Sequence, residues 1–99
     1  MSGEPGLREA GAAAGEDGLA QRKRLRMRSW RRGIKEMDLI LGRFADARLE
    51  TLTDDELALY DTLLSENDQD LYDWVSGRST PPLAYVPLLS RIAEHAKDG

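Results

Sequence analysis

Residues 53–77, TDDELALYDTLLSENDQDLYDWVSG, contain the start and stop signals of two consecutive helices. A threonine opens this stretch and a glutamate follows three residues later, a spacing that predicts a capping box at a helix start. Asn67 or Asp68 is expected to cap a shorter second helix. Gly77 is expected to end it, because glycine readily adopts the left-handed conformation that follows many helices. The side chains expected to be buried in these two helices are Leu57, Tyr60, Leu63, Leu64, Leu71, Trp74 and Val75.

The helical pattern continues on the N-terminal side of this stretch. Gly33 interrupts it and would cost about 1 kcal/mol relative to alanine inside a helix. We therefore expect two helices, over about 21–31 and about 34–47, with Leu25, Met27 and Trp30 of the first facing inward. The pattern consists of apolar residues at steps of three and four, the spacing of one helix face: Met27, Trp30, Ile34, Met37, Leu41 and Phe44.

A fifth helix is expected near the C-terminus. Pro81 and Pro82 follow Thr80, and proline is tolerated in the first turn of a helix. Pro87 comes soon after, so the regular helix is expected over about 83–96. Its inner face would contain Val86, Leu89, Ile92 and Ala93. No stretch shows the alternation or the hairpin turns of strands, so the fold class is all-α, a compact bundle of about five short helices.

The chain divides into a tail and one domain. Residues 1–19 are rich in glycine and alanine and cannot bury enough apolar surface to offset the entropy of ordering, which predicts a disordered N-terminal tail. Residues 20–99 are expected to form a single helical domain. The tail lacks the apolar core of a secretory signal and is too acidic for a mitochondrial presequence, so we expect a cytoplasmic protein.

The composition excludes several classes of function. The 99 residues include no cysteine and one histidine, which excludes disulfide frameworks, thiolate metal sites and thiol nucleophiles. No apolar run reaches the roughly 18 residues that span a bilayer. No glycine-rich phosphate loop is present, so no cofactor is expected to bind independently. These observations indicate a protein that is not an enzyme and has no metal site or membrane span.

Charge is strongly segregated along the chain. Residues 22–35 hold eight of the 14 basic residues, whereas residues 50–73 hold nine of the 18 acidic residues and no lysine or arginine. Two interpretations stay open, since the blocks can neutralise each other across the fold or can orient a partner. The basic segment 22–35 also suggests an alternative function, a small nucleic-acid-binding regulator. The acidic half would repel a polyanion, so a protein-binding face is favoured over a nucleic acid partner. A membrane-surface helix is a third possibility.

The junction at Gly33 carries the candidate partner-binding residues. Glycine has no Cβ and permits close approach of another backbone. Arg32 can present a planar fork of donors, and Glu36 and Asp38 can accept hydrogen bonds. Physical reasoning alone favours a simpler interpretation, in which Glu36 stabilises the N-terminus of the second helix and offsets Lys35.

Three ordered motifs resemble those of the succinate dehydrogenase assembly factor family. Arg32-Gly33-x-x-Glu36 followed by Asp38 is similar to the family's RGxxE region. The other two motifs lie in residues 52–56 (LTDDE) and 68–74 (DQDLYDW). The resemblance covers roughly residues 22–96.

This resemblance implies a small five-helix fold that binds the flavoprotein subunit of succinate dehydrogenase, and in many members that of fumarate reductase. Such proteins are chaperones that promote covalent attachment of FAD to their client and act on the client's FAD. The residues expected to contact the client are Arg32, Gly33 and Glu36 of the motif, with Arg31 and Asp38 beside them. The free protein is expected to be a monomer.

Overall fold

The computed structural model describes residues 16–98, which contain five α-helices and no strand. The predicted all-α class is confirmed. Two 3₁₀ turns lie next to the helices, one at Leu49–Thr51 after α2 and one at Leu83–Tyr85 before α5. The helices are α1 (Gly18–Ser29), α2 (Lys35–Arg48), α3 (Asp54–Leu63), α4 (Asp68–Ser76) and α5 (Val86–Asp98). None of these helices is long and apolar enough to cross a membrane.

The local start and stop signals act as expected. In the capping box, the Glu56 amide donates to Thr53 Oγ1 at 3.2 Å, and the Thr53 amide donates to Glu56 Oε1 at 2.9 Å. Asn67 caps α4, and Gly77 ends it with φ of 85°. The expected break between the first two helices lies at residues 30–34.

The start of α1 differs from the expectation. Most of the expected disordered tail, residues 1–15, lies outside the described residues. The helix begins at Gly18, about three residues earlier than expected, because the Asp17 carboxylate accepts a hydrogen bond from the Ala20 amide at 2.7 Å.

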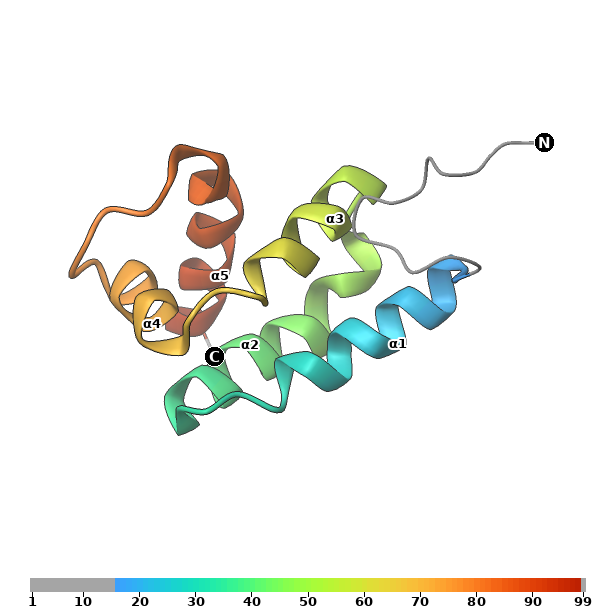
Figure 1. Cartoon of the computed structure of the whole chain (residues 1–99), viewed down its shortest axis with the longest axis horizontal. Helices are drawn as coiled ribbons and strands as arrows, with labels where there is room; N and C mark the ends of the chain where they lie inside the picture. The colour runs from blue at the N-terminus through green and yellow to red at the C-terminus, as the bar shows by residue number, and fades with distance from the viewer. Residues whose placement is uncertain (1–15, 99) are drawn as a thin grey trace.

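Helix α2 lies at the centre of the fold. Figure 1 shows α1 running beside it, while α4 and α5 lie toward its other side. Helix α3 is joined to α1 by a buried polar contact, in which Ser29 Oγ and the Tyr60 hydroxyl lie 2.6 Å apart. Ser29 Oγ also lies 2.7 Å from the Leu25 carbonyl, to which it donates. Burial raises the pKa of Tyr60 to about 12, so this hydroxyl stays protonated at neutral pH.

The core collects side chains from every helix. Tyr60 and Phe44 are its largest fully buried members, and their ring centroids lie 5.8 Å apart. Most residues expected in the core are found there, although Trp74 and Val75 are only partly buried against it. The other buried apolar residues are Leu25, Met37, Leu41, Ala45, Leu49, Leu52, Leu57, Leu63, Leu64, Leu71, Tyr85, Leu88, Leu89 and Ile92.

Three residues expected to face inward are exposed, so those predictions are wrong. Met27 is 47% exposed because Leu25 and Ser29 define the buried face of α1, and a residue midway between them points the opposite way. Trp30 is 39% exposed because it lies just beyond the end of α1. Val86 is 37% exposed at the first position of α5, whose inner face uses Leu88 instead.

Gly42, in the middle of α2, provides the surface against which Trp30 packs. A Cβ atom at Gly42 would overlap the ring carbons Cδ2, Cε2 and Cε3 of Trp30. The indole Nε1 donates to Asp46 Oδ1, 3.3 Å away and one turn further along the helix. The missing side chain therefore lets the end of α1 approach α2 closely.

Gly42→Ala should lower the free energy of unfolding by about 1–2 kcal/mol, because the new methyl group must displace the Trp30 ring. In a Trp30→Ala background the same change should raise stability by up to about 1 kcal/mol, since alanine favours helix more than glycine does. Urea denaturation of the four proteins, followed by helical circular dichroism, measures both effects. The same sign in both backgrounds would contradict the packing of Trp30 on Gly42.

Candidate functional site

The α1–α2 linker, residues 30–34, is fixed by contacts at both of its ends. The Trp30 and Arg31 amides continue the last turn of α1, donating to the carbonyls of Met27 and Arg28 at 3.2 Å each. The Arg32 amide donates to Asp38 Oδ1 in the first turn of α2. Asp38 therefore holds the linker against the helix that follows it, and its carboxylate faces the molecule's own backbone.

Arg32 is the main anchor of this linker. Its side chain is only 9% exposed. The guanidinium donates from Nε to Asp68 Oδ1 at 2.7 Å, from Nη1 to the Leu64 carbonyl at 2.8 Å and from Nη2 to the Glu66 carbonyl at 3.2 Å. These are charge-assisted bonds from a rigid planar donor, which are stronger than neutral ones. Arg32, Leu64, Glu66 and Asp68, here called the Arg32 cluster, join the α1–α2 linker to the α3–α4 turn.

Gly33 contacts the same cluster. Its amide donates to Asp68 Oδ2, while Oδ1 of the same carboxylate accepts the hydrogen bond from Arg32 Nε. A Cβ atom at Gly33 would lie 3.0 Å from Asp68 Oδ2, closer than side chains usually approach. The space beside Gly33 is therefore partly occupied by Asp68, a residue of this chain, although Gly33 itself stays exposed.

Glu66 and Tyr85 support the α3–α4 turn from its other side. The Tyr85 hydroxyl donates to Glu66 Oε2 at 2.7 Å, and its ring lies 5.8 Å from that of Trp74. Burial, together with the Glu66 carboxylate, raises the pKa of Tyr85 to about 12. Sequence reasoning did not identify this pair, because the two residues are 19 positions apart and belong to no local motif.

The five sequence-predicted contact residues thus divide into two groups. Arg32 and Asp38 turn inward and fix the linker, whereas Arg31, Gly33 and Glu36 are exposed. Within residues 16–98, no hydrogen bond or ion pair holds the side chains of Arg31 or Glu36. Residues 31–36, which are the linker from Arg31 onward and the first two residues of α2, are called the presenting loop below.

Half of the eight basic residues in segment 22–35 form ion pairs within the fold. Arg24 and Arg28 both bind the Asp61 carboxylate, the former at 2.8 Å, and Arg26 lies 3.3 Å from Asp46. Each pair joins two different helices. The interpretation in which the charged blocks pair with each other is therefore confirmed for Arg24 and Arg28, whereas the partner of Arg26 lies outside residues 50–73.

Few cations of this segment remain available to a partner. Arg22 donates to the carbonyls of Leu49 and Leu52 at 3.3 Å each. Together with the pairs above, this leaves little of the basic surface that a nucleic-acid-binding regulator needs, and that alternative is unsupported. The exposed cations of the segment that lack an ion pair within the described residues are Lys23, Arg31 and Lys35.

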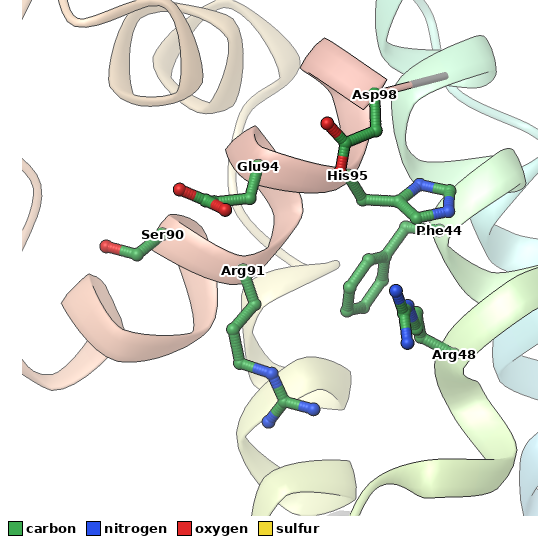
Figure 2. Close-up of a pocket in the computed structure, with 7 residues that line it drawn as sticks. All are labelled: Phe44, Arg48, Ser90, Arg91, Glu94, His95 and Asp98. Carbon is green, nitrogen blue, oxygen red and sulfur yellow. The ribbon is translucent and has the colours of Figure 1, made fainter.

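A concave region lies between α2 and α5. Its volume is about 480 Å³, and Figure 2 shows the seven side chains that line it. Phe44 meets His95 edge-on with ring centroids 6.0 Å apart, so this histidine packs as a structural residue. Arg91 is paired with Glu56 at 2.7 Å. The lining combines two arginines with two carboxylates, a mixture that favours neither an anion nor a cation. No cluster of metal-ligating side chains occurs in residues 16–98.

Comparison with known proteins places this geometry in a family. A family model described as flavinator of succinate dehydrogenase matches residues 23–96, which include the presenting loop and the Arg32 cluster. The chain belongs to this family. The resemblance inferred from the three motifs is thereby confirmed.

Relatives in bacteria and fungi agree with the assignment. A protein of Acetobacter pasteurianus named FAD assembly factor SdhE is 34% identical over 95 residues, covering 94% of this chain and 87% of the relative. A Legionella pneumophila protein of the same name is 37% identical over 62 residues, covering 63% and 78%. A Cryptococcus neoformans protein named mitochondrial succinate dehydrogenase assembly factor 2 is 37% identical over 86 residues. The alignment covers 85% of this chain but only 49% of that relative, so the chain spans about half the length of the mitochondrial protein.

Arg32→Ala should lower the free energy of unfolding by about 3 kcal/mol, because the Asp68 carboxylate and the carbonyls of Leu64 and Glu66 lose their hydrogen-bond donor. Arg31→Ala, one residue away, is the matched control and should change stability by less than about 0.5 kcal/mol. Chemical denaturation measures both. Equal effects of the two substitutions would contradict the anchoring role of Arg32.

The Asp61 pairs should make the fold sensitive to acid. Burial raises the pKa of this carboxyl, but the hydrogen bonds from Arg24 and Arg28 outweigh burial, and the pKa lies below its usual value. Since an unfolded aspartate titrates near about 3.9, the pairing stabilises the fold above about pH 4 and is lost as pH falls through the folded-state pKa.

Asp61→Asn should therefore lower the free energy of unfolding at pH 7 by about 2 kcal/mol. Between pH 6 and pH 3, the free energy of unfolding should fall less in this variant than in the wild type. Asp55→Asn, at an exposed position, serves as the control. Urea titrations at each pH provide the measurement, and a parallel decline in wild type and Asp61→Asn would refute the assignment.

Proposed function

We propose that this chain is an FAD assembly factor that binds the flavoprotein subunit of succinate dehydrogenase and promotes covalent attachment of FAD to it. The observation that carries the proposal is the family match over residues 23–96. The bacterial relative named for this role supports it, because the alignment covers 87% of that relative. The presenting loop adds a physical reason. Its exposed residues are Arg31, Gly33 and Glu36, and the hydrogen bonds of Arg32 and Asp38 hold the segment in place.

The presenting loop is the surface through which the client is held. Arg31 offers a guanidinium, Glu36 offers a carboxylate, and Gly33 between them allows a polypeptide to approach closely. Arg32 and Asp38 are positioning residues in this proposal, because their polar groups are used inside the molecule. An anchored loop loses little entropy on docking, which favours binding.

The role is that of a chaperone without catalytic residues of its own. FAD and its acceptor side chain belong to the client, and this chain restrains the client so that the reacting groups meet at lower entropic cost. The flavoprotein subunit of fumarate reductase is a second candidate client. The protein is proposed to act in the cytoplasm and to be a monomer when free.

Glu36→Ala and Gly33→Leu should each reduce covalent flavin in the client at least about tenfold, because docking loses a charged contact or meets a steric block. The assay is co-expression with the succinate dehydrogenase flavoprotein in a host that lacks its own assembly factor, read by in-gel flavin fluorescence. Glu50→Ala, which changes an exposed glutamate in the 3₁₀ turn after α2, is the matched control and should behave as wild type.

Three outcomes separate the possibilities. No covalent flavin above background with the wild-type chain would refute the proposed function. Wild-type levels with both variants would refute the assignment of the presenting loop. Loss of helical circular dichroism in Gly33→Leu would assign that residue to folding, through its contact with Asp68, and leave Glu36 as the test of docking.

A further inference from the structure

The outer face of α1 combines exposed charge with an exposed apolar side chain. Ala20, Lys23 and Met27 follow one another at steps of three and four residues and therefore lie on one side of the helix, and Arg31, just beyond the end of α1, lines the same hollow. This side is opposite the one that buries Leu25. Met27, at its centre, is 47% exposed.

A shallow hollow of about 330 Å³ lies on this face. The basic side chains that line it differ in whether they form an ion pair within the fold. Arg24 and Arg28 are turned to Asp61. Lys23 and Arg31, in contrast, have no ion pair or hydrogen bond to their side chains from the part of the chain that the structure describes. The hollow is lined by Ala20, Lys23, Arg24, Met27, Arg28 and Arg31.

We infer that this face of α1 is a second contact surface for the flavoprotein client and that it receives an acidic segment of that polypeptide. The inference rests on the proposed function. The segment would place an apolar side chain over Met27 and a carboxylate near each of Lys23 and Arg31.

The surface is continuous with the presenting loop. Arg31 belongs to both, so a polypeptide seated on Gly33 and Glu36 reaches the hollow by extending along α1 in the direction of its N-terminus. A contact at the loop alone is small, whereas stable protein interfaces bury on the order of 800 Å² on each partner. The outer face of α1 supplies adjoining area, with an apolar centre and a charged rim of the kind that interfaces use.

The chemistry favours a protein over other polyanions. Nucleic acid binding depends on neutralising many phosphates, and anionic membranes are bound by clusters of about 4–8 basic residues. Only Lys23 and Arg31, with Lys35 nearby, are available here, and the chain carries a net charge of −4. Two cations around one apolar side chain match a protein surface better than a phosphate array.

The test measures affinity for the purified succinate dehydrogenase flavoprotein subunit as a function of salt. Lys23→Glu should weaken binding about tenfold at low salt, mainly through slower association, and should flatten the salt dependence. Met27→Ala should weaken binding about threefold to tenfold, through faster dissociation. The matched controls are Lys97→Glu on α5 and Leu83→Ala, whose side chain is 86% exposed, and both should bind within about twofold of wild type.

Each remaining outcome overturns the inference. Wild-type affinity in both α1 variants would remove this face from the interface, and intact covalent flavin formation would show that the proposed function stands. Absence of client binding by the wild-type chain would overturn the inference together with the proposed function. If Lys23→Glu lowers binding to phosphatidylglycerol vesicles or duplex DNA but not to the client, the face serves a different partner.

Discussion

The hydrogen bonds of the Arg32 guanidinium connect two segments that have no regular structure of their own. The α1–α2 linker and the α3–α4 turn each leave backbone groups without helical partners, and Arg32 satisfies two carbonyls of the turn while Asp68 accepts from the Gly33 amide. Each segment thus fixes the other. The order of the presenting loop, and with it the orientation of Glu36, depends on this cluster.

Ion pairs between residues far apart in the sequence also hold other parts of the fold together. The basic and acidic segments are far apart in sequence, but folding brings Arg24 and Arg28 against Asp61 and Arg32 against Asp68. The Asp61 pairs join α1 to α3, and the Arg32 pair joins the α1–α2 linker to the start of α4. Together with the Arg26–Asp46 pair they engage four of the eight basic residues in 22–35. The cations of this segment that stay exposed without an ion pair in the described residues are Lys23, Arg31 and Lys35, close to Met27 and Gly33 in the chain. In the proposed function, this limited group of charges would contact the client.

The sequence was most informative where interactions are local. The capping box at Thr53, the cap at Asn67 and the stop at Gly77 each involve atoms within a few residues, so their signals are visible in the chain. Contacts across the fold left no such signal. Arg32 reaches Asp68 over 36 positions, and only the fold shows that it points inward. Motif resemblance pointed to this segment but did not distinguish its anchoring residues from its exposed ones. Met27 was misplaced because the apolar spacing continued through the helix break.

Arg32 acts from inside the molecule, and in the proposed function its exposed neighbours make the partner contacts. The most direct measurement is the exchange rate of the Arg32 side-chain Nε proton in the free protein, by nitrogen-15 NMR, with Arg31 as the internal reference. The Arg32 proton should exchange with water at least about tenfold more slowly than that of Arg31, because it is bound to Asp68 and shielded from solvent. Equal exchange rates for the two arginines would contradict the anchoring of Arg32 inside the molecule.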